Sequence, residues 1–237
     1  MITAVATVLN EADIIGISVD HLLASGVDHI YIALSDISDD GTRKILSHYP
    51  SSHLTVIDDN RPYHDQPYWT RYLSDLASVN GATWVLPFDA DEFIYPLHDE
   101  SIPAALAHVP ANVNKILMPR WLHRDWDWRH NTPEQLPKVA WRGGVPITCH
   151  PGNHDVTVPG NSHYGNTVLA IRELSFRSYE HMAVKCQERV ARIDPSFGWE
   201  YGTHQRVLAA LTENELREAW AAMQDIPSVY DPIPVRA

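Results

Sequence analysis

Short apolar runs alternate with amphipathic segments through the N-terminal part of the chain. Residues 2–9, 29–34, 54–58 and 83–88 are apolar runs of strand length, and the segments between them, 11–25, 41–49 and 66–79, have helical patterning. Parallel strands cannot be joined by a tight turn and need a crossover connection, which is usually a helix. The alternation therefore predicts an α/β fold, with a mostly parallel central sheet and helices on both of its faces.

The middle and C-terminal parts have a different character. Residues 110–166 are rich in Pro, Gly, Trp and His and contain one clear strand, 115–118, so we expect long loops and a small antiparallel ribbon there. Helices are expected at residues 178–192, 201–211 and 212–223, the last beginning with the capping box Thr212-x-x-Glu215. The Pro-rich tail is expected to be loose. We predict one domain, made of an α/β half, a loop-rich segment and C-terminal helices with the tail, over residues 1–109, 110–177 and 178–237.

The charge balance excludes two classes of partner. The chain of 237 residues carries a net charge of −12, whereas a nucleic-acid-binding protein needs a basic face that displaces counterions. Docking on anionic lipid by charge is excluded for the same reason. The chain has no run of about 18 apolar residues, so no membrane span is expected. Residues 1–15 lack the basic start of a signal peptide, and a cytoplasmic location is expected.

Acidic side chains follow several of the predicted strands. The strand at 2–9 is followed by Glu11, the strand at 29–34 by a loop that contains Asp36, and the strand at 83–88 by Asp89 and Asp91. The carboxyl ends of parallel strands meet at one edge of the sheet, where ligands bind in folds of this type. Two carboxylates in the pattern Asp-x-Asp supply hard oxygen ligands for Mg²⁺ or Mn²⁺, which can hold a diphosphate. A solvated acidic loop is the alternative.

The stretch Gly-Asn-His-Asp at 152–155 is typical of metallophosphoesterases, where it contributes to a two-metal centre. The companion motifs of such a centre are D-x-H early in the chain, G-D-x-x-D, and a late G-H-x-H. No D-x-H precedes this stretch, and the other two motifs do not occur in the sequence. One part of a two-metal site does not make a site, so a metallophosphoesterase is only a remote alternative.

Six blocks of the sequence together resemble the glycosyltransferase family 2 group, which has the GT-A fold. In chain order they are VLNEADII, HLLASGVDHIYI, SDISDDGT, WVLPFDADEF, GNHDV and RSYE, and they extend over roughly residues 4 to 190. The resemblance is to the bacterial branch with the NEADII, DxDEF and GNHDV motifs. It implies metal-dependent transfer of a hexosyl group from a nucleoside-diphosphate sugar to an acceptor hydroxyl, with inversion at the anomeric carbon and with Mn²⁺ or Mg²⁺ as cofactor.

The resemblance also implies roles for single residues. Glu11 and Asp36 would contact the base and ribose of the donor, and Asp89 would face the ribose or the metal ion. Asp91 and His154 would ligate the metal ion. The cations near the diphosphate would be Arg71, Arg177 and Lys185. For Arg71 and Lys185 a place on an ordinary helix surface is the alternative, and Glu11 could simply favour the start of its helix through the helix dipole.

Three positions depart from the pattern of this family. Ser35 stands where relatives have an aspartate, Leu9 where an aromatic residue is common, and Glu173 where relatives often have a histidine. The first two leave the identity of the donor's nucleobase open, and the third changes a metal ligand or a proton carrier. These departures keep a second hypothesis in place, a nucleotide-sugar-binding protein without transferase activity.

The residue that takes the acceptor proton is not identified by a motif. Asp155 is the first candidate because it adjoins His154, and Glu173 and Asp125 are its rivals; Asp155 could instead orient the histidine. The segment PRWLHRDWDWRH supplies Trp121, Trp126 and Trp128, whose rings are suited to pack on the C–H faces of the donor or acceptor sugar. Core packing of Trp121, with the other two as loop anchors, is the alternative.

The partners expected from this reading are a nucleoside-diphosphate sugar and an acceptor, which can be a glycan, a lipid-linked molecule or a small molecule. Loose association with a membrane would suit a lipid-linked acceptor. The sequence is compatible with a homo-oligomer and contains nothing that demands one.

Overall fold

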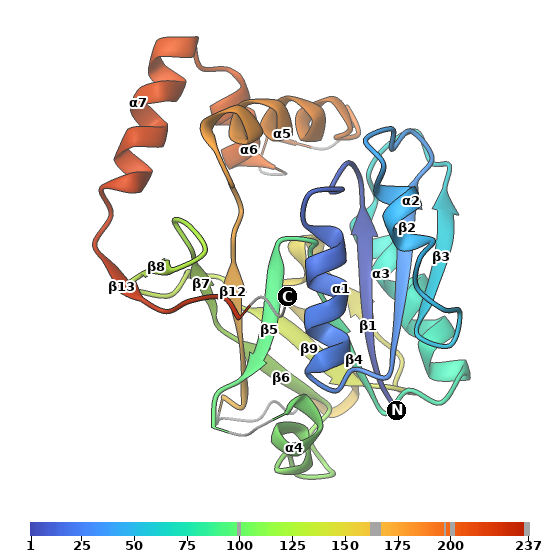
Figure 1. Cartoon of the computed structure of the whole chain (residues 1–237). Helices are drawn as coiled ribbons and strands as arrows, with labels where there is room; N and C mark the ends of the chain where they lie inside the picture. Colours follow the sequence, from blue (N-terminus) through green and yellow to red (C-terminus); the bar gives the residue numbers. More distant parts are fainter. Residues whose placement is uncertain (99–100, 162–166, 197, 200–201, 235–237) are drawn as a thin grey trace.

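The computed structural model describes residues 1–98, 101–161, 167–196, 198–199 and 202–234 (Figure 1). Its central sheet has six strands in the order β3-β2-β1-β4-β9-β6. These strands are β1 (Ile2–Val8), β2 (His29–Ser35), β3 (Leu54–Asp59), β4 (Trp84–Pro87), β6 (Lys115–Met118) and β9 (Lys138–Arg142). The first four are parallel to one another, and β9 is antiparallel to both β4 and β6. The predicted α/β class with a mostly parallel sheet is confirmed.

Alternate residues of β1 point to opposite faces of the sheet, because side chains alternate along a strand. Ala4, Ala6 and Val8 belong to one core cluster, which includes the apolar face of α1 (Ile15–Ala24). Val5 belongs to a second cluster with residues of α3 (Gln66–Val79). Helices therefore cover both faces of the sheet, as predicted. The short helices α2 (Thr42–Leu46) and α4 (Ile102–Ala107) complete the α/β part.

The segment expected to consist mainly of loops contains more strand than predicted. A second sheet has the order β5-β12-β7, made of β5 (Glu92–Pro96), β12 (Leu169–Glu173) and β7 (Arg120–Leu122). In its antiparallel register, Glu173 on β12 lies opposite Glu92 on β5. Two small ribbons pair β10 (Thr148–Cys149) with β11 (Val156–Thr157), and β8 (Trp128–His130) with β13 (Ser228–Tyr230). The strands are short and carry many Trp, Arg and His residues, so their alternation is hard to see in the sequence.

The C-terminal helices form a small unit beside the sheet. They are α5 (Tyr179–Ala191), α6 (Thr203–Ala209) and α7 (Glu213–Gln224), and they share an apolar cluster around Met182, Cys186 and Leu208. The predicted capping box at the start of α7 is present. Figure 1 shows α5 and α6 on the side of the sheet toward which β1 runs. This unit therefore lies over the edge at which the parallel strands end.

Two local expectations were wrong. The first helix begins at Ile15 rather than at residue 11, and Asn10 before it adopts a left-handed conformation with φ 49°. The Asn10 side chain instead bonds to the loop after β2 and to Glu188 on α5. The tail is not loose over its described part, since β13 pairs with β8; residues 235–237 lie outside the described residues. Within the described residues, no helix combines the length and apolarity that a membrane crossing requires.

Candidate functional site

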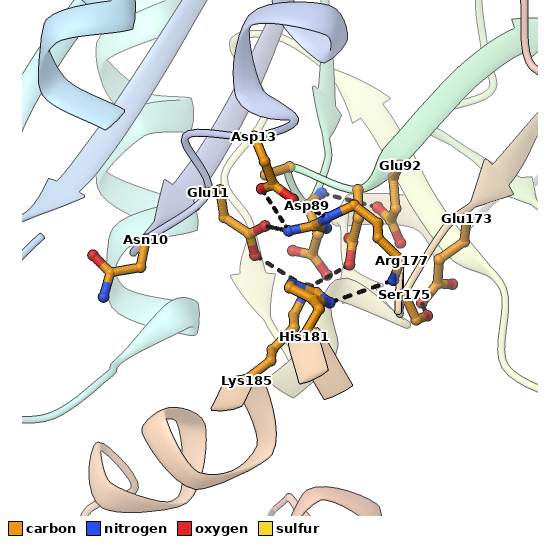
Figure 2. Close-up of polar contacts among 12 residues, drawn as sticks. Asn10, Glu11, Asp13, Asp89, Glu92, Glu173, Ser175, Arg177, His181 and Lys185 are labelled. Carbon is orange, nitrogen blue, oxygen red and sulfur yellow. Dashed lines mark hydrogen bonds and ion pairs between the residues drawn. The ribbon is translucent and has the colours of Figure 1, made fainter. Parts of the chain in front are cut away.

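Charged side chains from both halves of the chain meet at the carboxyl ends of β1 and β4. We call this group the rim cluster, and Figure 2 shows most of its members. It consists of six carboxylates and four cations: Glu11, Asp13, Asp89, Asp91, Glu92, Glu173, Arg120, Lys138, Arg177 and Lys185. The acids after β1 and β4 are those that the sequence placed at this edge. The cations come from the second half of the chain.

Lys185 on α5 lies between Glu11, a predicted donor-binding residue, and Asp91, a predicted metal ligand. Its Nζ is 2.6 Å from Oδ2 of Asp91 and 3.1 Å from Oε1 of Glu11. Burial lowers the pKa of Lys185, but the two carboxylates outweigh burial and hold its pKa above the ordinary value. Burial also raises the pKa of Glu11, an effect that Lys185 opposes. Lys185 is therefore a permanent cation at the end of β1 and β4.

Arg177 is the second cation on Glu11. Its Nη2 donates to Oε2 of Glu11 at 2.9 Å and to Oδ1 of Asp13 at 2.8 Å. The arginine precedes α5, whose first turn is capped by the Ser178 side chain accepting from the His181 N–H at 3.1 Å. The Arg-Ser-x-Glu stretch thus starts the helix and directs its arginine at the loop after β1.

Lys138 is shared by two carboxylates, the partly exposed Asp89 and the buried Glu92. Its Nζ lies 2.7 Å from Oδ2 of Asp89 and 3.1 Å from Oε2 of Glu92, and the side chains of Lys138 and Glu92 are each only 1% exposed. Burial raises the pKa of Asp89, but Lys138 outweighs burial and brings that pKa well below its usual range. The pKa of Glu92 is raised to about 8, chiefly by burial and further by the charge of Asp89. One ammonium group cannot neutralise both acids, so Glu92 retains a proton near neutral pH.

Glu173, one of the two rival candidates for the base, has a cation of its own. The Nη1 of Arg120 lies 2.5 Å from Oε2 of Glu173, and the Ser175 hydroxyl donates to Oε1 at 2.7 Å. Burial raises the pKa of Glu173, which Arg120 opposes. Both side chains of the pair are 13% exposed, so Glu173 is nearer to solvent than Glu92.

The Gly-Asn-His-Asp stretch is joined to Asp89 through Gln66, the first residue of α3. The Gln66 side-chain amide donates to Oδ1 of Asp89 at 3.3 Å, and its carbonyl accepts from the Gly152 N–H at 2.9 Å. Gly152 has φ 75°, and a Cβ there would lie 2.4 Å from the ring of His154. Only glycine therefore allows this turn with the histidine in its present place.

His154 has the features of a neutral imidazole. Its Nδ1 is 2.9 Å from the Pro137 carbonyl oxygen, which requires a proton on Nδ1 and leaves Nε2 with its lone pair. Burial lowers the pKa of His154, and Arg120 and Lys138 lower it further. A histidine held in this way has the tautomer that a metal ligand needs.

The three predicted metal ligands are not assembled into a metal centre. Asp89 and Asp91 are of the right chemical type, but each carries the ammonium group of a lysine. Across the described ranges, no group of three or more His, Cys, Asp or Glu side chains could hold a metal ion. As placed, these residues do not fit a metal ion, because Lys138 and Lys185 already supply the positive charge. The assignment of Asp89, Asp91 and His154 as ligands stays a prediction.

Several predicted site residues lie apart from the rim cluster. Asp36 is exposed, and the Arg71 side chain is 64% exposed beside Asp75 on α3. Asp155, the first candidate for the base, accepts from Lys115 at 2.8 Å, and its side chain is 58% exposed. Asp125 accepts from two N–H groups of its own turn. None of these four forms a hydrogen bond or ion pair with a member of the rim cluster in the described part of the chain.

The three tryptophans of the expected sugar wall have separate surroundings. The guanidinium of Arg129 lies 3.9 Å from the ring centroid of Trp121. Trp126 packs edge-on against Phe93 and the main core. Trp128 packs edge-on against Tyr230 of the tail and is 39% exposed. A sugar wall made of all three stays a prediction.

Sequence reasoning missed Gln66, Arg120 and Lys138. Lys138 stands at the start of the stretch KVAWR, where a lysine before an apolar strand normally lies at the surface. Nothing in that stretch shows that the lysine points inward. Gln66 was seen only as the start of a helix. The one sequence signal that could have identified these residues is their position, a polar side chain at the end of a strand or helix.

A small cavity lies beside the rim cluster, at the ends of β1, β2 and β3. Its lining residues are Thr7, Val8, Leu9, Ser35, Asp59, His64, Arg189 and Arg192. Burial lowers the pKa of His64 to about 3, so this ring is neutral. Residues at the end of β1 and just after it line one part of the cavity. Hydrogen-bonding side chains at the ends of β2 and β3 and two arginines at the end of α5 line the rest.

No protein-family model matches this chain, and no curated protein matches it significantly. Among solved structures, it is similar to residues 1–349 of Staphylococcus aureus TarS in complex with UDP-GlcNAc, with 11% identity, a TM-score of 0.49 and coverage of 95% of this chain and 81% of that one. It is also similar to a Mycobacterium tuberculosis glucosyl-3-phosphoglycerate synthase bound to Mn²⁺, UDP and product, with 16% identity, a TM-score of 0.34 and coverage of 52% and 44%.

A third similar structure has a different chemistry. It is the 4-diphosphocytidyl-2C-methyl-D-erythritol synthase of Anaerococcus prevotii, with 11% identity, a TM-score of 0.39 and coverage of 94% of this chain and 96% of that one. The chain spans less than half of the length of the mycobacterial synthase. No residue role or activity follows from likenesses of this strength.

Proposed function

We propose that this protein is a glycosyltransferase of the GT-A type, which moves a hexosyl group from a nucleoside-diphosphate sugar to an acceptor hydroxyl with inversion. The observation that carries the proposal is the pairing of Lys185 and Arg177 with Glu11 and Asp91 at the carboxyl ends of β1 and β4. Ligands bind at this edge in open parallel sheets. The carboxylates suit hydroxyl donors of a ribose or sugar, and the cations suit a diphosphate.

In the proposed reaction, the acceptor oxygen forms a bond to the anomeric carbon while the bond from that carbon to the diphosphate oxygen breaks. Negative charge grows on the leaving diphosphate, and fixed cations at that place lower the barrier. Lys185 and Arg177 are such cations, and they are already oriented by Glu11 and Asp13. The acceptor proton passes to a carboxylate.

For this carboxylate we favour Glu173 over the first candidate, Asp155. Glu173 belongs to the rim cluster, and burial raises its pKa toward the range in which a general base works well. Asp155 is held by Lys115, and its pKa is lowered: burial raises it, but the hydrogen bonds from Lys115 and from the Val156 N–H, together with the charge of Lys115, outweigh burial. Glu92 is too deeply buried to meet an acceptor, with a side chain 1% exposed.

Use of Mn²⁺ or Mg²⁺ stays a prediction from the sequence within this proposal. A divalent cation would be held by Asp91, Asp89 and the Nε2 of His154, and it would supply positive charge to the leaving diphosphate. Lys138 and Lys185 would have to release the two carboxylates first. Comparing activity in EDTA with activity in Mn²⁺ checks this part separately.

The second candidate is a nucleotide-sugar-binding protein without transfer. It is favoured by the ion pairs on Asp89 and Asp91, which leave neither carboxylate free in the described residues. Release of nucleoside diphosphate from a panel of nucleotide sugars, with a panel of sugar acceptors, separates the two candidates. Release that depends on the acceptor supports the transferase, and tight binding without release supports the binding protein. If no nucleotide sugar binds at all, both are wrong.

A further inference from the structure

Helix α5 and its last residue carry a line of three cations. Lys185, Arg189 and Arg192 follow one another at spacings of four and three residues, so they lie on one face of the helix. Met182 and Cys186 lie beside this row and pack against α6 and α7. We call the three cations the α5 stripe. The apolar face anchors the helix, and the stripe is turned toward the carboxyl ends of the strands.

The two ends of the stripe contact different strands. Lys185 reaches Asp91 and Glu11, which follow β4 and β1. Arg192 donates from Nη1 to the Ser35 hydroxyl at 2.7 Å, and its Nη2 is 3.8 Å from Oδ2 of Asp59. Ser35 ends β2 and Asp59 ends β3. Because the sheet order is β3-β2-β1-β4, the stripe runs across the ends of all four parallel strands.

The middle cation has no ion-pair partner within the described residues, although its charge helps to lower the pKa of Asp89. Arg189 is half-buried and lines the cavity, yet its side chain makes no hydrogen bond or ion pair with any residue that the structure describes. Its neighbour Arg192 is buried, and its Nε also lacks a partner among these residues. A guanidinium group that is removed from water without a hydrogen-bond partner destabilises the fold, unless a ligand accepts its hydrogen bonds. The unpaired donors therefore mark a place for an anion.

We infer that the α5 stripe binds the nucleoside-diphosphate part of the donor along its length. This inference rests on the proposed function and adds Arg189 and Arg192 to its binding residues. Arg189 holds the diphosphate. Arg192, with Ser35 and Asp59, contacts the nucleoside, because these hydrogen-bonding groups line the same cavity as the apolar Leu9. Lys185 lies at the sugar end, beside the carboxylates of the rim cluster.

A purely structural stripe that neutralises the acidic edge is the competing explanation. It accounts for Lys185 and Arg192, which both have acidic or hydroxyl partners. It accounts only in part for Arg189, whose charge acts on Asp89 but which forms no ion pair or side-chain hydrogen bond within the described residues. Arg189→Gln is therefore the informative substitution, because it removes the charge and the guanidinium donors, keeps a polar side chain and breaks no described ion pair.

The experiment measures binding of UDP, GDP, ADP, CDP and dTDP to the full chain by calorimetry, in EDTA and in Mn²⁺. For the diphosphate that binds the wild-type protein best, Arg189→Gln should weaken binding about tenfold, which is typical of a lost charged hydrogen bond. Its melting temperature should equal that of the wild type. The control Arg217→Gln removes an exposed cation of α7 and should leave the dissociation constant unchanged. Arg192→Lys, which keeps the charge but not the planar fork, should also weaken binding.

A change of less than threefold in Arg189→Gln would overturn the inference while leaving the proposed function in place. If the wild-type protein binds none of the five diphosphates, the proposed function is wrong and the inference falls with it. If the substitutions in the α5 stripe weaken nucleoside-diphosphate binding as expected but the wild-type protein transfers no sugar, the inference stands and the transferase proposal fails.

Discussion

The ammonium nitrogen of Lys185 lies 2.6 Å from a carboxylate oxygen of Asp91, although 94 positions separate the two residues. The contact joins the C-terminal helix α5 to the loop after β4. Glu11, after β1, is the second partner of the same ammonium group, at 3.1 Å. Stability and ligand binding are thus linked at one place, because the group that neutralises two buried acids also faces the proposed donor site.

Replacing Lys185 with methionine should destabilise the fold by about 3 kcal/mol, because Asp91 and Glu11 would lose their shared cation while remaining buried. Urea unfolding measures the loss. In the double variant Lys185→Met/Asp91→Asn the loss should be smaller than the sum of the two single losses, since the two residues interact directly. Arg217→Met, at an exposed helix pair, should change stability by less than about 0.5 kcal/mol. A small loss in Lys185→Met, equal to that of this control, would contradict the interpretation.

Glu92 should make stability fall as the pH rises. Its pKa is raised from an ordinary value of 4.5 to about 8 in the folded chain. Between these values the folded protein retains a proton that the unfolded chain has released, so the stabilising contribution is complete below the lower value and lost through the upper one. The slope from this group is at most about 1.4 kcal/mol per pH unit.

Glu92→Gln does not titrate and should lack this fall. The difference in unfolding free energy between wild type and Glu92→Gln, measured in urea at pH 5, 6, 7 and 8, should therefore shift steadily in favour of the variant. Glu213→Gln, at a carboxylate of α7 with a side chain 71% exposed, controls for the change of charge. A difference that stays constant over this range would show that Glu92 is ionised throughout.

The two candidate bases give opposite kinetic expectations. If Glu173 takes the acceptor proton, Glu173→Gln should lower kcat about a hundredfold or more, which is typical of a lost general base. Asp155→Asn should keep a rate close to that of the wild type. The donor affinity of both variants, measured separately, shows whether binding is intact. The reverse pattern would restore Asp155 as the base.

Gly152 should be irreplaceable for two separate reasons. Its φ is 75°, which disfavours any side chain, and an added Cβ would lie 2.5 Å from Nε2 of His154. Gly160 has nearly the same φ, 76°, but open space around it. Gly160→Ala should therefore cost about 1–2 kcal/mol from the backbone alone, and Gly152→Ala should cost clearly more. Equal losses in thermal and urea unfolding would mean that the ring moves aside freely.

His154 and Asp91 should act together if a metal ion takes part. His154→Ala and Asp91→Ala should each remove the gain in nucleoside-diphosphate affinity that Mn²⁺ brings, and should leave binding in EDTA much less affected. Because burial lowers the pKa of His154, this histidine is neutral and can ligate at pH 7. If His154→Ala retains the full effect of Mn²⁺, the Gly-Asn-His-Asp stretch is a structural turn only.

The order of secondary structure in the first half followed from the sequence, because apolar periodicity and glycine stops act locally. The boundaries of α3 and β6 agree with the prediction residue for residue. The start of α1 did not, because the side chain of Asn10 has partners on the β2 loop and on α5, which only the folded chain brings near. Between residues 110 and 166 only β6 and a small ribbon were predicted; the other short strands were not, since their pairing is decided by distant partners.

The sequence by itself determined the α/β class, the parallel sheet and the edge at which Glu11, Asp89 and Asp91 gather, because parallel strands must present their carboxyl ends together. Only the tertiary structure decided which cations meet these acids. Lys138 lies on a short strand, and Arg177 and Lys185 lie at the start of a helix and within it, far along the chain; ion pairing at such separations leaves no periodic trace in the sequence. The strength of those pairs depends on burial, and burial is a property of the packed fold alone.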